Sequence, residues 1–245
     1  MATKRAVIIQ ARMSSSRFPG KSLQMIGDKP LVYYVVKRLE LSGLPVIVAT
    51  STDTSDDILA EYLQSQKIKI FRGSLLNVLN RYISAAEEFG VEEIVRVTAD
   101  NPLVDITALK SSLILFGKYD YVDGIYQNGL IIGTGFEMVR LKELKSIKSS
   151  DQFNCEHVTA ALRDNLNNNH RYRRLQIPHY HQFKDKIILT CDFVEDLELL
   201  RRIFKASDYS VDIKIQDILS FYIENRDIFQ INANLHKNRG PETFI

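Results

Sequence analysis

The feature that most constrains the fold is an alternation of short apolar runs with segments of helical periodicity. Four runs are rich in Val, Ile and other apolar residues, at positions 5–11, 45–51, 68–73 and 93–100. The segments between them carry apolar residues at helical spacing, at positions 29–43, 54–66 and 77–90. Strands that alternate with helices form mostly parallel sheets flanked by helices, and their crossovers are nearly always right-handed. The first hundred residues therefore predict an α/β, Rossmann-like fold.

The second half of the chain is less regular. Residues 119–139 are rich in Tyr, Gly and alternating apolar residues, which predicts hairpins or an inserted β region. Further helices are expected at 106–118, 155–169, 195–206 and 214–228, and further strands at 171–178 and 186–193. Because no internal repeat or low-complexity linker interrupts the chain, we expect a single domain over residues 1–245 with an inserted β region at about 119–139.

The bulk composition excludes several classes of protein. The chain has 245 residues, of which 45% are hydrophobic and 25% charged, and its formal net charge of +2 lacks the basic excess of nucleic-acid binders. Its two cysteines, Cys155 and Cys191, match no zinc or redox spacing. The apolar run near the N-terminus is too short for a signal-peptide core, and no run is long enough to span a bilayer. We therefore expect a cytoplasmic protein with no nucleic-acid or membrane partner.

Cationic side chains follow the first predicted strand. Arg12, Arg17 and Lys21 lie within ten residues of one another and are interleaved with Ser14, Ser15 and Ser16. In open α/β sheets, ligands bind beyond the carboxyl ends of the strands. Guanidinium and ammonium groups neutralise phosphate oxygens there, although three cations in a loop are more often solvated surface.

Two carboxylates are expected at the same edge of the sheet. Asp100 follows the fourth strand, and Asp192 ends the later run at 186–193. Carboxylate oxygens hold Mg²⁺, which needs one or two of them together with substrate phosphates. The alternative for Asp192 is a cap on the helix at 195–206. The residues alone thus indicate an α/β enzyme that handles phosphates, with a nucleotide as the expected ligand.

The tripeptide Gly20-Lys21-Ser22 also ends a Walker A phosphate loop. That motif requires a glycine five residues before Gly20, where this chain has Ser15. Pro19 would remove a backbone donor from the cradle, and the nearest strong helix start is at Pro30. A P-loop NTPase would hydrolyse ATP or GTP in a manner that depends on Lys21, and this alternative is the weaker one.

Several blocks resemble a known family. The stretch "IIQARMSSSRFPGKS" at 8–22 resembles the opening of the cytidylyltransferases, the CMP-sugar synthetases that activate acylneuraminate and 3-deoxy-octulosonate, and is most similar to the branch of spore coat polysaccharide biosynthesis. Later blocks of that branch are matched, in order, at 71–82, 95–105, 155–162 and 189–204. The resemblance implies a nucleotide-diphosphosugar transferase fold of GT-A type. It also implies transfer of CMP from CTP to a sugar hydroxyl, with Mg²⁺ and release of pyrophosphate.

The resemblance also assigns roles to residues. It implies that the catalytic residues are Arg12, Lys21 and Asp100, and that Mg²⁺ is bound by Asp100 and Asp192. It implies a nucleotide site made of Gln10, Ala11, Arg12, Ser15, Arg17, Lys21, Arg72 and Thr98. On the sugar side it points to Glu137, Glu156 and His157, with a buried, hydrogen-bonded histidine as the alternative for His157. The chain departs from the family pattern at Ala99, Asn77, Asn80 and Gly135, and a methyl group at Ala99 could crowd the nucleotide.

The expected function is therefore activation of a sugar, most consistent with an acidic or nonulosonate-type sugar, for surface polysaccharide or glycan synthesis. The alternatives are a glycosyltransferase that uses a preformed nucleotide sugar and a non-catalytic nucleotide-binding module. Members of the family form dimers through an inserted β arm, which residues 119–139 could supply, so a homodimer is among the expectations.

Overall fold

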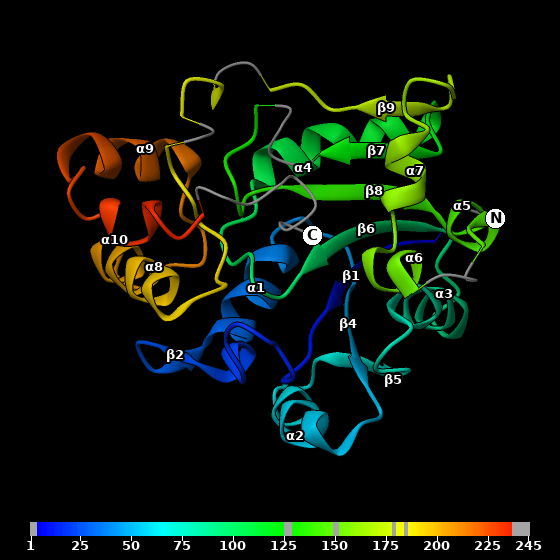
Figure 1. Cartoon of the computed structure of the whole chain (residues 1–245), viewed down its shortest axis with the longest axis horizontal. Helices are drawn as coiled ribbons and strands as arrows, with labels where there is room; N and C mark the ends of the chain where they lie inside the picture. Colours follow the sequence, from blue (N-terminus) through cyan, green and yellow to red (C-terminus); the bar gives the residue numbers. More distant parts are fainter. Residues whose placement is uncertain (1–3, 125–128, 149–151, 178–179, 184–185, 237–245) are drawn as a thin grey trace.

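A seven-stranded sheet forms the centre of the computed structural model, which describes residues 4–124, 129–148, 152–177, 180–183 and 186–236 (Figure 1). Its strands are β1 (Arg5–Gln10), β4 (Val46–Ser51), β5 (Lys69–Gly73), β6 (Glu93–Thr98), β7 (Tyr121–Gly124), β8 (Phe136–Arg140) and β9 (Tyr172–Arg174), in the order β5-β4-β1-β6-β8-β7-β9. Strand β8 runs antiparallel to both its neighbours, whereas the other four neighbouring pairs are parallel. The predicted α/β class with a mostly parallel sheet is confirmed.

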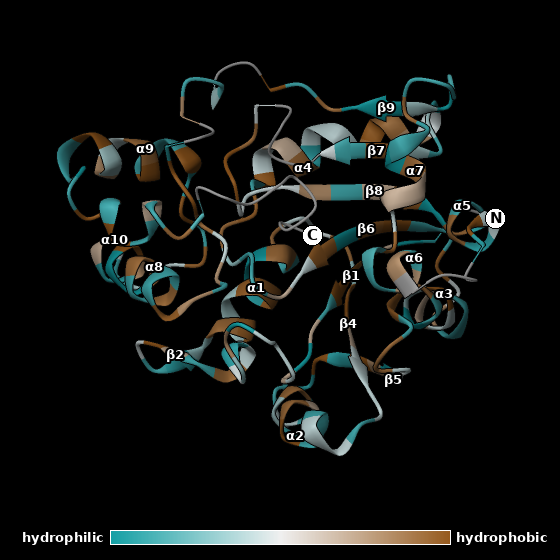
Figure 2. Ribbon diagram, viewed as in Figure 1, coloured by the Kyte–Doolittle hydropathy of each residue, from teal (hydrophilic) through white to brown (hydrophobic). Residues whose placement is uncertain are grey.

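Helices cover both faces of the sheet because each central strand is apolar on both sides. Val7 and Ile9 of β1 pack against α1 (Leu31–Glu40), α2 (Asp57–Ser65) and α4 (Ile106–Ser112). Ala6 and Ile8 face the opposite way and join α3 (Val78–Glu88), α5 (Leu141–Ser146) and α7 (Ala160–Asp164). Figure 2 shows the hydrophobic residues concentrated on the central strands and on the inward sides of the helices. Burial on both faces explains the near-continuous apolar runs of the sequence.

A third group of elements packs beside the sheet. Helices α8 (Val194–Ala206), α9 (Ile215–Glu224) and α10 (Gln230–Ala233) lie together, away from α3 and α5 (Figure 1). Their apolar side chains form a core with Leu31 and Tyr34 of α1. Buried Arg38 of α1 joins this group of helices to the elements around the sheet. Its guanidinium donates to the carbonyl oxygen of Val104, just before α4, and to those of Val211 and Ile213, between α8 and α9. The smaller elements are η1 (Lys21–Leu23), η2 (Thr54–Asp56), η3 (Leu113–Gly117), α6 (Gln152–His157) and the strand pair β2 (Met25–Ile26) and β3 (Lys29–Pro30).

The described parts of 119–139 do not form an arm that projects from the sheet. Strand β8 pairs with β6 and β7, and β7 also pairs with β9, so both strands extend the central sheet. Their residues are almost all buried, and the polar positions that interrupt the apolar pattern, Asp123 and Glu137, are buried as well. Residues 125–128 lie outside the described part of the chain, and the homodimer stays a prediction.

Two further local predictions differ from the structure. The predicted strand at 186–193 does not form: within the described residues the segment has one isolated bridge, between Ile188 and Ile132, and Ile132 lies outside the strands of the sheet. The predicted helix at 155–169 is divided into α6 and α7, because Val158 adopts a left-handed conformation with φ of 45°. Apolar periodicity predicts neither the missing strand nor the interruption of the helix. None of the helices in the described ranges is both long and apolar enough to cross a membrane.

Candidate active site

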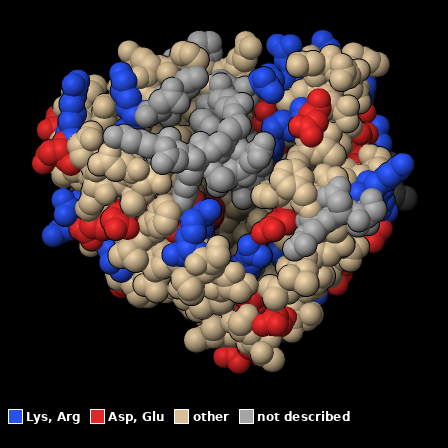
Figure 3. Space-filling model, viewed as in Figure 1, with Lys and Arg blue, Asp and Glu red and all other residues tan. Residues whose placement is uncertain are grey.

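The candidate site lies where the strand order reverses. From β1 the chain adds β4 and β5 on one side and then returns to add β6 on the other side, so the ends of β1 and β6 flank a crevice. A cavity of about 320 Å³ opens there, and Figure 3 shows basic and acidic side chains beside a hollow on this face. The cavity is lined by Gln10, Ala11, Arg12, Ser15, Ser16, Arg17, Lys21, Ser22, Val78, Arg81, Thr98, Ala99, Asp100, Phe153, Glu156, His157 and Asp192.

The loop after β1 is anchored by a buried carboxylate and turns at a glycine. Asp56 accepts hydrogen bonds from the backbone amides of Met13, at 2.6 Å, and Ser51, at 3.1 Å. Gly20 has a φ of 74°, which a glycine adopts without strain, and its amide donates to the Met13 carbonyl at 2.8 Å. An α-helix follows only at Leu31, with Pro30 as its N-cap residue. The loop therefore differs from a P-loop, whose helix starts at the Lys-Ser pair.

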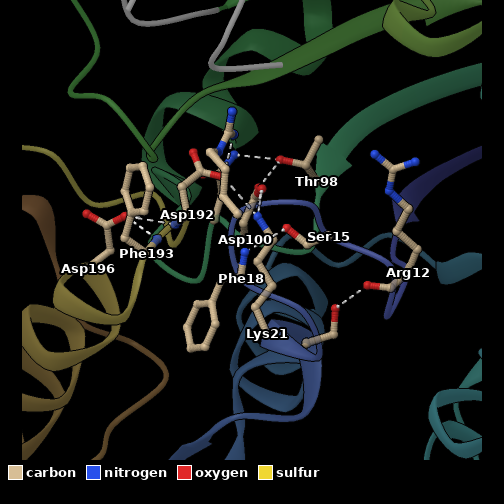
Figure 4. A network of polar contacts seen from close by, with 12 residues as sticks. Arg12, Ser15, Phe18, Lys21, Thr98, Asp100, Asp192, Phe193 and Asp196 are labelled. Carbon is tan, nitrogen blue, oxygen red and sulfur yellow. Dashed lines mark hydrogen bonds and ion pairs between the residues drawn. The ribbon is translucent and has the colours of Figure 1, made fainter. Parts of the chain in front are cut away.

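Lys21 connects two carboxylates that are distant in sequence. Its Nζ lies 2.7 Å from Oδ2 of Asp100 and 3.0 Å from Oδ1 of Asp192. Arg17 adds a third contact, with Nη2 2.8 Å from the same oxygen of Asp192. Figure 4 shows Lys21 extended from the first-strand loop toward both acids. The fold thus brings together the cationic loop and both of the carboxylates predicted at this edge of the sheet.

Burial and charge set the ionisation of this cluster. Burial favours the neutral form of Lys21, but the facing carboxylates of Asp100 and Asp192 outweigh it and raise the pKa of the ammonium. Burial would likewise raise the pKa of Asp192, but Lys21 and Arg17 hold it well below its usual value. The cluster therefore favours the charged forms of Lys21 and Asp192.

Hydrogen bonds from behind fix the Asp100 carboxylate and the backbone of Asp192. The Thr98 hydroxyl donates to Oδ1 of Asp100, and Asn101 donates to the same hydroxyl at 2.9 Å. Oδ2 of buried Asp196 accepts from the backbone amides of Asp192 and Phe193, both at 2.8 Å (Figure 4). Asp196, and not Asp192, therefore caps the start of α8, which leaves the Asp192 side chain directed at Lys21.

Asp196 is in turn held by the C-terminal part of the described chain. Its Oδ1 contacts Nδ2 of Asn232 at 2.7 Å and Nε2 of His236 at 2.8 Å. All three side chains are buried. This layer of contacts makes the position of the Asp192 backbone depend on α8 and α10 together.

Helix α6 supplies the other wall of the cavity. Arg12 Nη2 lies 3.2 Å from Oε1 of Glu156, and both side chains are partly exposed. His157 and Phe153 line the same wall, with their rings in contact. Two of the three residues predicted on the sugar side, Glu156 and His157, therefore lie across the cavity from the cationic loop.

The third predicted sugar-side residue, Glu137, does not line the cavity. Its side chain is 2% exposed and forms ion pairs with Arg96 and Arg163. Tyr121 and Thr159 also donate to its carboxylate. Burial would raise the pKa of Glu137, but Arg96 and Arg163 lower it to about 2. This network contacts the site indirectly, because Arg96 donates a hydrogen bond to Gln10 at the end of β1.

Gln10 lines the cavity and connects it to the Glu137 network, because its Oε1 accepts from Nη2 of Arg96 at 3.0 Å. The backbone of Gln10 and Ala11 is fixed on both sides, with Ala11 N donating to the Ala49 carbonyl and Ala99 N donating to the Gln10 carbonyl. Ala99 itself is 6% exposed and lines the cavity.

The two arginines of the second block differ in position. Arg72 lies outside the cavity lining, since its guanidinium contacts Asp57 at 2.6 Å and the Ser51 carbonyl at 2.7 Å. Arg81 lines the cavity although it is almost fully buried, and its Nη1 donates to the Ser74 carbonyl. The sequence patterns predicted no role for Arg81. An arginine on the apolar face of the helix at 77–90 was the signal that could have identified it.

The departures at Asn77 and Asn80 leave the cavity unaffected. Asn77 is the N-cap residue of α3, and its side-chain oxygen accepts from the Asn80 amide at 2.8 Å. Asparagine serves this role as well as aspartate does. The Asn80 side chain is exposed. Neither residue lines the cavity.

The paired carboxylates suit a hard divalent cation that completes its coordination with a ligand. Among the described residues no group of three or more His, Cys, Asp or Glu side chains could hold a metal ion. Asp100 and Asp192 are both within reach of one cation, as their shared contact with Lys21 shows. Mg²⁺ bound to nucleotide phosphates needs one or two protein carboxylates, so these residues fit that ion.

Comparisons with known proteins agree with this arrangement. The model of a cytidylyltransferase family matches residues 6–229. The spore coat polysaccharide biosynthesis protein SpsF of Bacillus subtilis is 29% identical, over 90% of this chain and 94% of that protein. The 8-amino-3,8-dideoxy-manno-octulosonate cytidylyltransferase of Shewanella sediminis is 28% identical over 63% of this chain and 64% of its own.

A solved structure of a cytidylyltransferase from Leptospira borgpetersenii superposes with a TM-score of 0.85 and 27% identity, covering 93% of this chain and 97% of that one. The family match extends over nearly the whole chain and includes the cationic loop, Asp100 and Asp192. The chain is therefore an enzyme of the cytidylyltransferase family.

Proposed function

We propose that this protein transfers CMP from CTP to a hydroxyl group of an acidic sugar and releases pyrophosphate. The observation that carries the proposal is the cluster in which Lys21 and Arg17 meet Asp100 and Asp192, opposite Arg12. Cations for a triphosphate and carboxylates for a divalent ion face one cavity. Two relatives support the sugar class, since one acts on an amino-dideoxy-octulosonate and another takes part in spore coat polysaccharide synthesis.

The proposed chemistry depends on positioning. Arg12, Arg17 and Lys21 would bind the triphosphate, and the sugar hydroxyl would attack the α-phosphorus in line with the leaving pyrophosphate. The new oxygen–phosphorus bond forms as the bond to the β-phosphate breaks, and the hydroxyl proton passes to water. Asp100 and Asp192 would hold Mg²⁺, which when bound neutralises charge on the phosphate oxygens. The protein's own contribution is alignment and charge neutralisation.

The sugar is proposed to bind toward α6. Glu156 contacts Arg12, so an arriving triphosphate that recruits Arg12 would free the Glu156 carboxylate for hydroxyl groups of the sugar. His157 and Phe153 line the same side and could pack against a sugar ring. An acidic sugar would meet the cationic loop with favourable charge.

Nucleotide preference and product provide the direct test. In a thermal-shift panel of CTP, ATP, GTP, UTP and dTTP with Mg²⁺, we expect CTP to raise the melting temperature most, because stabilisation grows with the ratio of ligand to its dissociation constant. With CTP and an acidic sugar such as 3-deoxy-octulosonate or an acylneuraminate, pyrophosphate and a CMP-sugar should form in equal amounts. Consumption of a preformed nucleotide sugar without pyrophosphate, or hydrolysis of ATP or GTP, would contradict the proposal.

A comparison of Arg12→Met with Arg72→Met tests two of the three arginines that the family resemblance places at the nucleotide. We expect Arg12→Met to weaken CTP binding about tenfold or more, because hydrogen bonds to charged groups are worth about 1.5–3 kcal/mol. Arg72→Met should have a much smaller effect, since the Arg72 guanidinium contacts Asp57 and backbone carbonyls outside the cavity. Calorimetric titration with CTP measures the affinity of both variants. Equal losses of affinity would show that Arg72 reaches the nucleotide after all.

A further inference from the structure

The ammonium group of Lys21 occupies the position between the two carboxylates that are proposed to hold the metal. Nζ contacts Asp100 at 2.7 Å and Asp192 at 3.0 Å, and the exposed fractions of the three side chains are 12%, 21% and 4%. The same two carboxylates thus serve two cations, one of which is part of the chain. The inference below rests on the proposed function.

A divalent ion and the Lys21 ammonium compete for these oxygens. Both are cations, and in a partly buried site their repulsion at a few ångströms is screened far less than in water. Lys21 contacts one oxygen of each carboxylate, and the other oxygen of Asp100 accepts from Thr98, so a metal ion that bridges both acids meets the ammonium group there. Lys21 must therefore withdraw before a metal ion can bind both acids with full strength.

Lys21 is the residue of the cluster whose side chain can move. The carboxylates are held from behind, Asp100 by the Thr98 hydroxyl and the Asp192 backbone by the Asp196 carboxylate. Lys21 has a flexible four-carbon stem and three rotatable donors. Arg17 contacts only Asp192 of the pair, and its side chain is 39% exposed. The triphosphate offers Lys21 a more highly charged partner in the same cavity.

We propose that Lys21 is a built-in counter-ion that makes metal binding conditional on the nucleotide. Without nucleotide its ammonium neutralises Asp100 and Asp192 and weakens their affinity for a divalent cation. When a triphosphate draws Lys21 away, the two acids become available to the metal. By linkage, the metal must favour nucleotide binding by the same factor. Replacement of Lys21 should uncouple the two binding events.

The test is the affinity of the nucleotide-free protein for Mn²⁺, measured by electron paramagnetic resonance or calorimetry. We expect Lys21→Met to bind Mn²⁺ about tenfold more tightly than wild type, within the usual range of coupling between sites. Lys21→Gln, which keeps a hydrogen-bond donor without the charge, should show the same gain and serves if the Met variant folds poorly. Adding Asp100→Asn to either variant should remove the gain.

Two controls test whether the effect is specific. Lys37→Met removes the same charge from an exposed pair with Glu40 and should leave Mn²⁺ affinity unchanged. Arg17→Met removes a neighbouring cation that contacts Asp192 and does not join the two acids. Its affinity for Mn²⁺ should rise far less than that of Lys21→Met.

The coupling itself is measured as the ratio of Mn²⁺ affinities with and without CTP. Binding of Mn²⁺ to CTP in solution is common to wild type and variants and cancels in the comparison. The ratio should be smaller in Lys21→Met than in wild type. If the Lys21 variants bind Mn²⁺ no more tightly than wild type while CTP still promotes metal binding that depends on Asp100, this inference is wrong and the proposed function stands. If no form binds Mn²⁺ with or without CTP, both are overturned.

Discussion

Asp100→Ala should lower the rate of pyrophosphate release from CTP by at least about 10²–10³-fold, a loss typical of removing one preorganised electrostatic group. Asp100 is one of the two carboxylates proposed to hold the metal, and its side chain contacts Lys21 at 2.7 Å. Its removal takes away a metal ligand and leaves Lys21 with Asp192 alone. The measurement is steady-state pyrophosphate release at saturating CTP, sugar and Mg²⁺.

The matched control is Asp212→Ala. Asp212 forms an exposed ion pair with Lys214 and does not line the cavity. This variant should keep the wild-type rate, which separates the loss of a site carboxylate from the loss of any aspartate. Circular dichroism should show that Asp100→Ala keeps its fold, because the Asp100 side chain is partly exposed. Near-normal turnover of Asp100→Ala would refute the role assigned to this residue.

Glu137→Ala should reduce the free energy of unfolding by about 3–5 kcal/mol, the usual cost of breaking a buried ion pair. Glu137 neutralises both Arg96 and Arg163 in the buried part of the sheet, so its removal leaves two cations without their carboxylate. Urea denaturation followed by circular dichroism measures the loss. Glu198→Ala, which breaks an exposed pair with Arg202 on α8, should cost less than about 1 kcal/mol.

Acid should weaken the contribution of Glu137 in a defined range. Because the arginines depress its folded-state pKa to about 2, from 4.5, its carboxylate stabilises the fold fully above about pH 4.5. That stabilisation is lost as the pH falls toward 2, so the stability difference between wild type and Glu137→Gln should shrink over this interval. A difference that stays constant down to pH 2 would show that the ion pairs do not determine it.

The same variants decide whether Glu137 binds the sugar. As a buried residue it should affect activity only through the position of Gln10, by way of Arg96. We therefore expect Glu137→Gln to alter the kinetics for CTP at least as much as those for the sugar. An increase in KM for the sugar alone, with unchanged stability, would instead support the direct contact that the family resemblance implied.

The alternation of strands and helices was enough to predict the first half of the fold. Strands β1, β4 and β6 lie where apolar runs of Val and Ile predicted them, because parallel strands buried on both faces require such runs. The edge strand β5 also lies at its predicted position, although its residues are only partly buried. The second half of the fold was less predictable from local patterns. A bridge at Ile188 replaces a full strand, and Val158 interrupts a helix, because both outcomes depend on contacts with distant elements and not on local periodicity.

The sequence by itself determined the class of fold, the cationic loop at Arg12, Arg17 and Lys21, and the candidate carboxylates, since residue type and strand ends are local properties. Only the tertiary structure decided which of these side chains meet. It brought Asp192 to Asp100 across 92 positions by packing α8 beside the sheet, and it buried Glu137 between two arginines. Pairing of charges depends on where elements distant in sequence pack, and a strand-end position alone does not specify the partner that a side chain will contact.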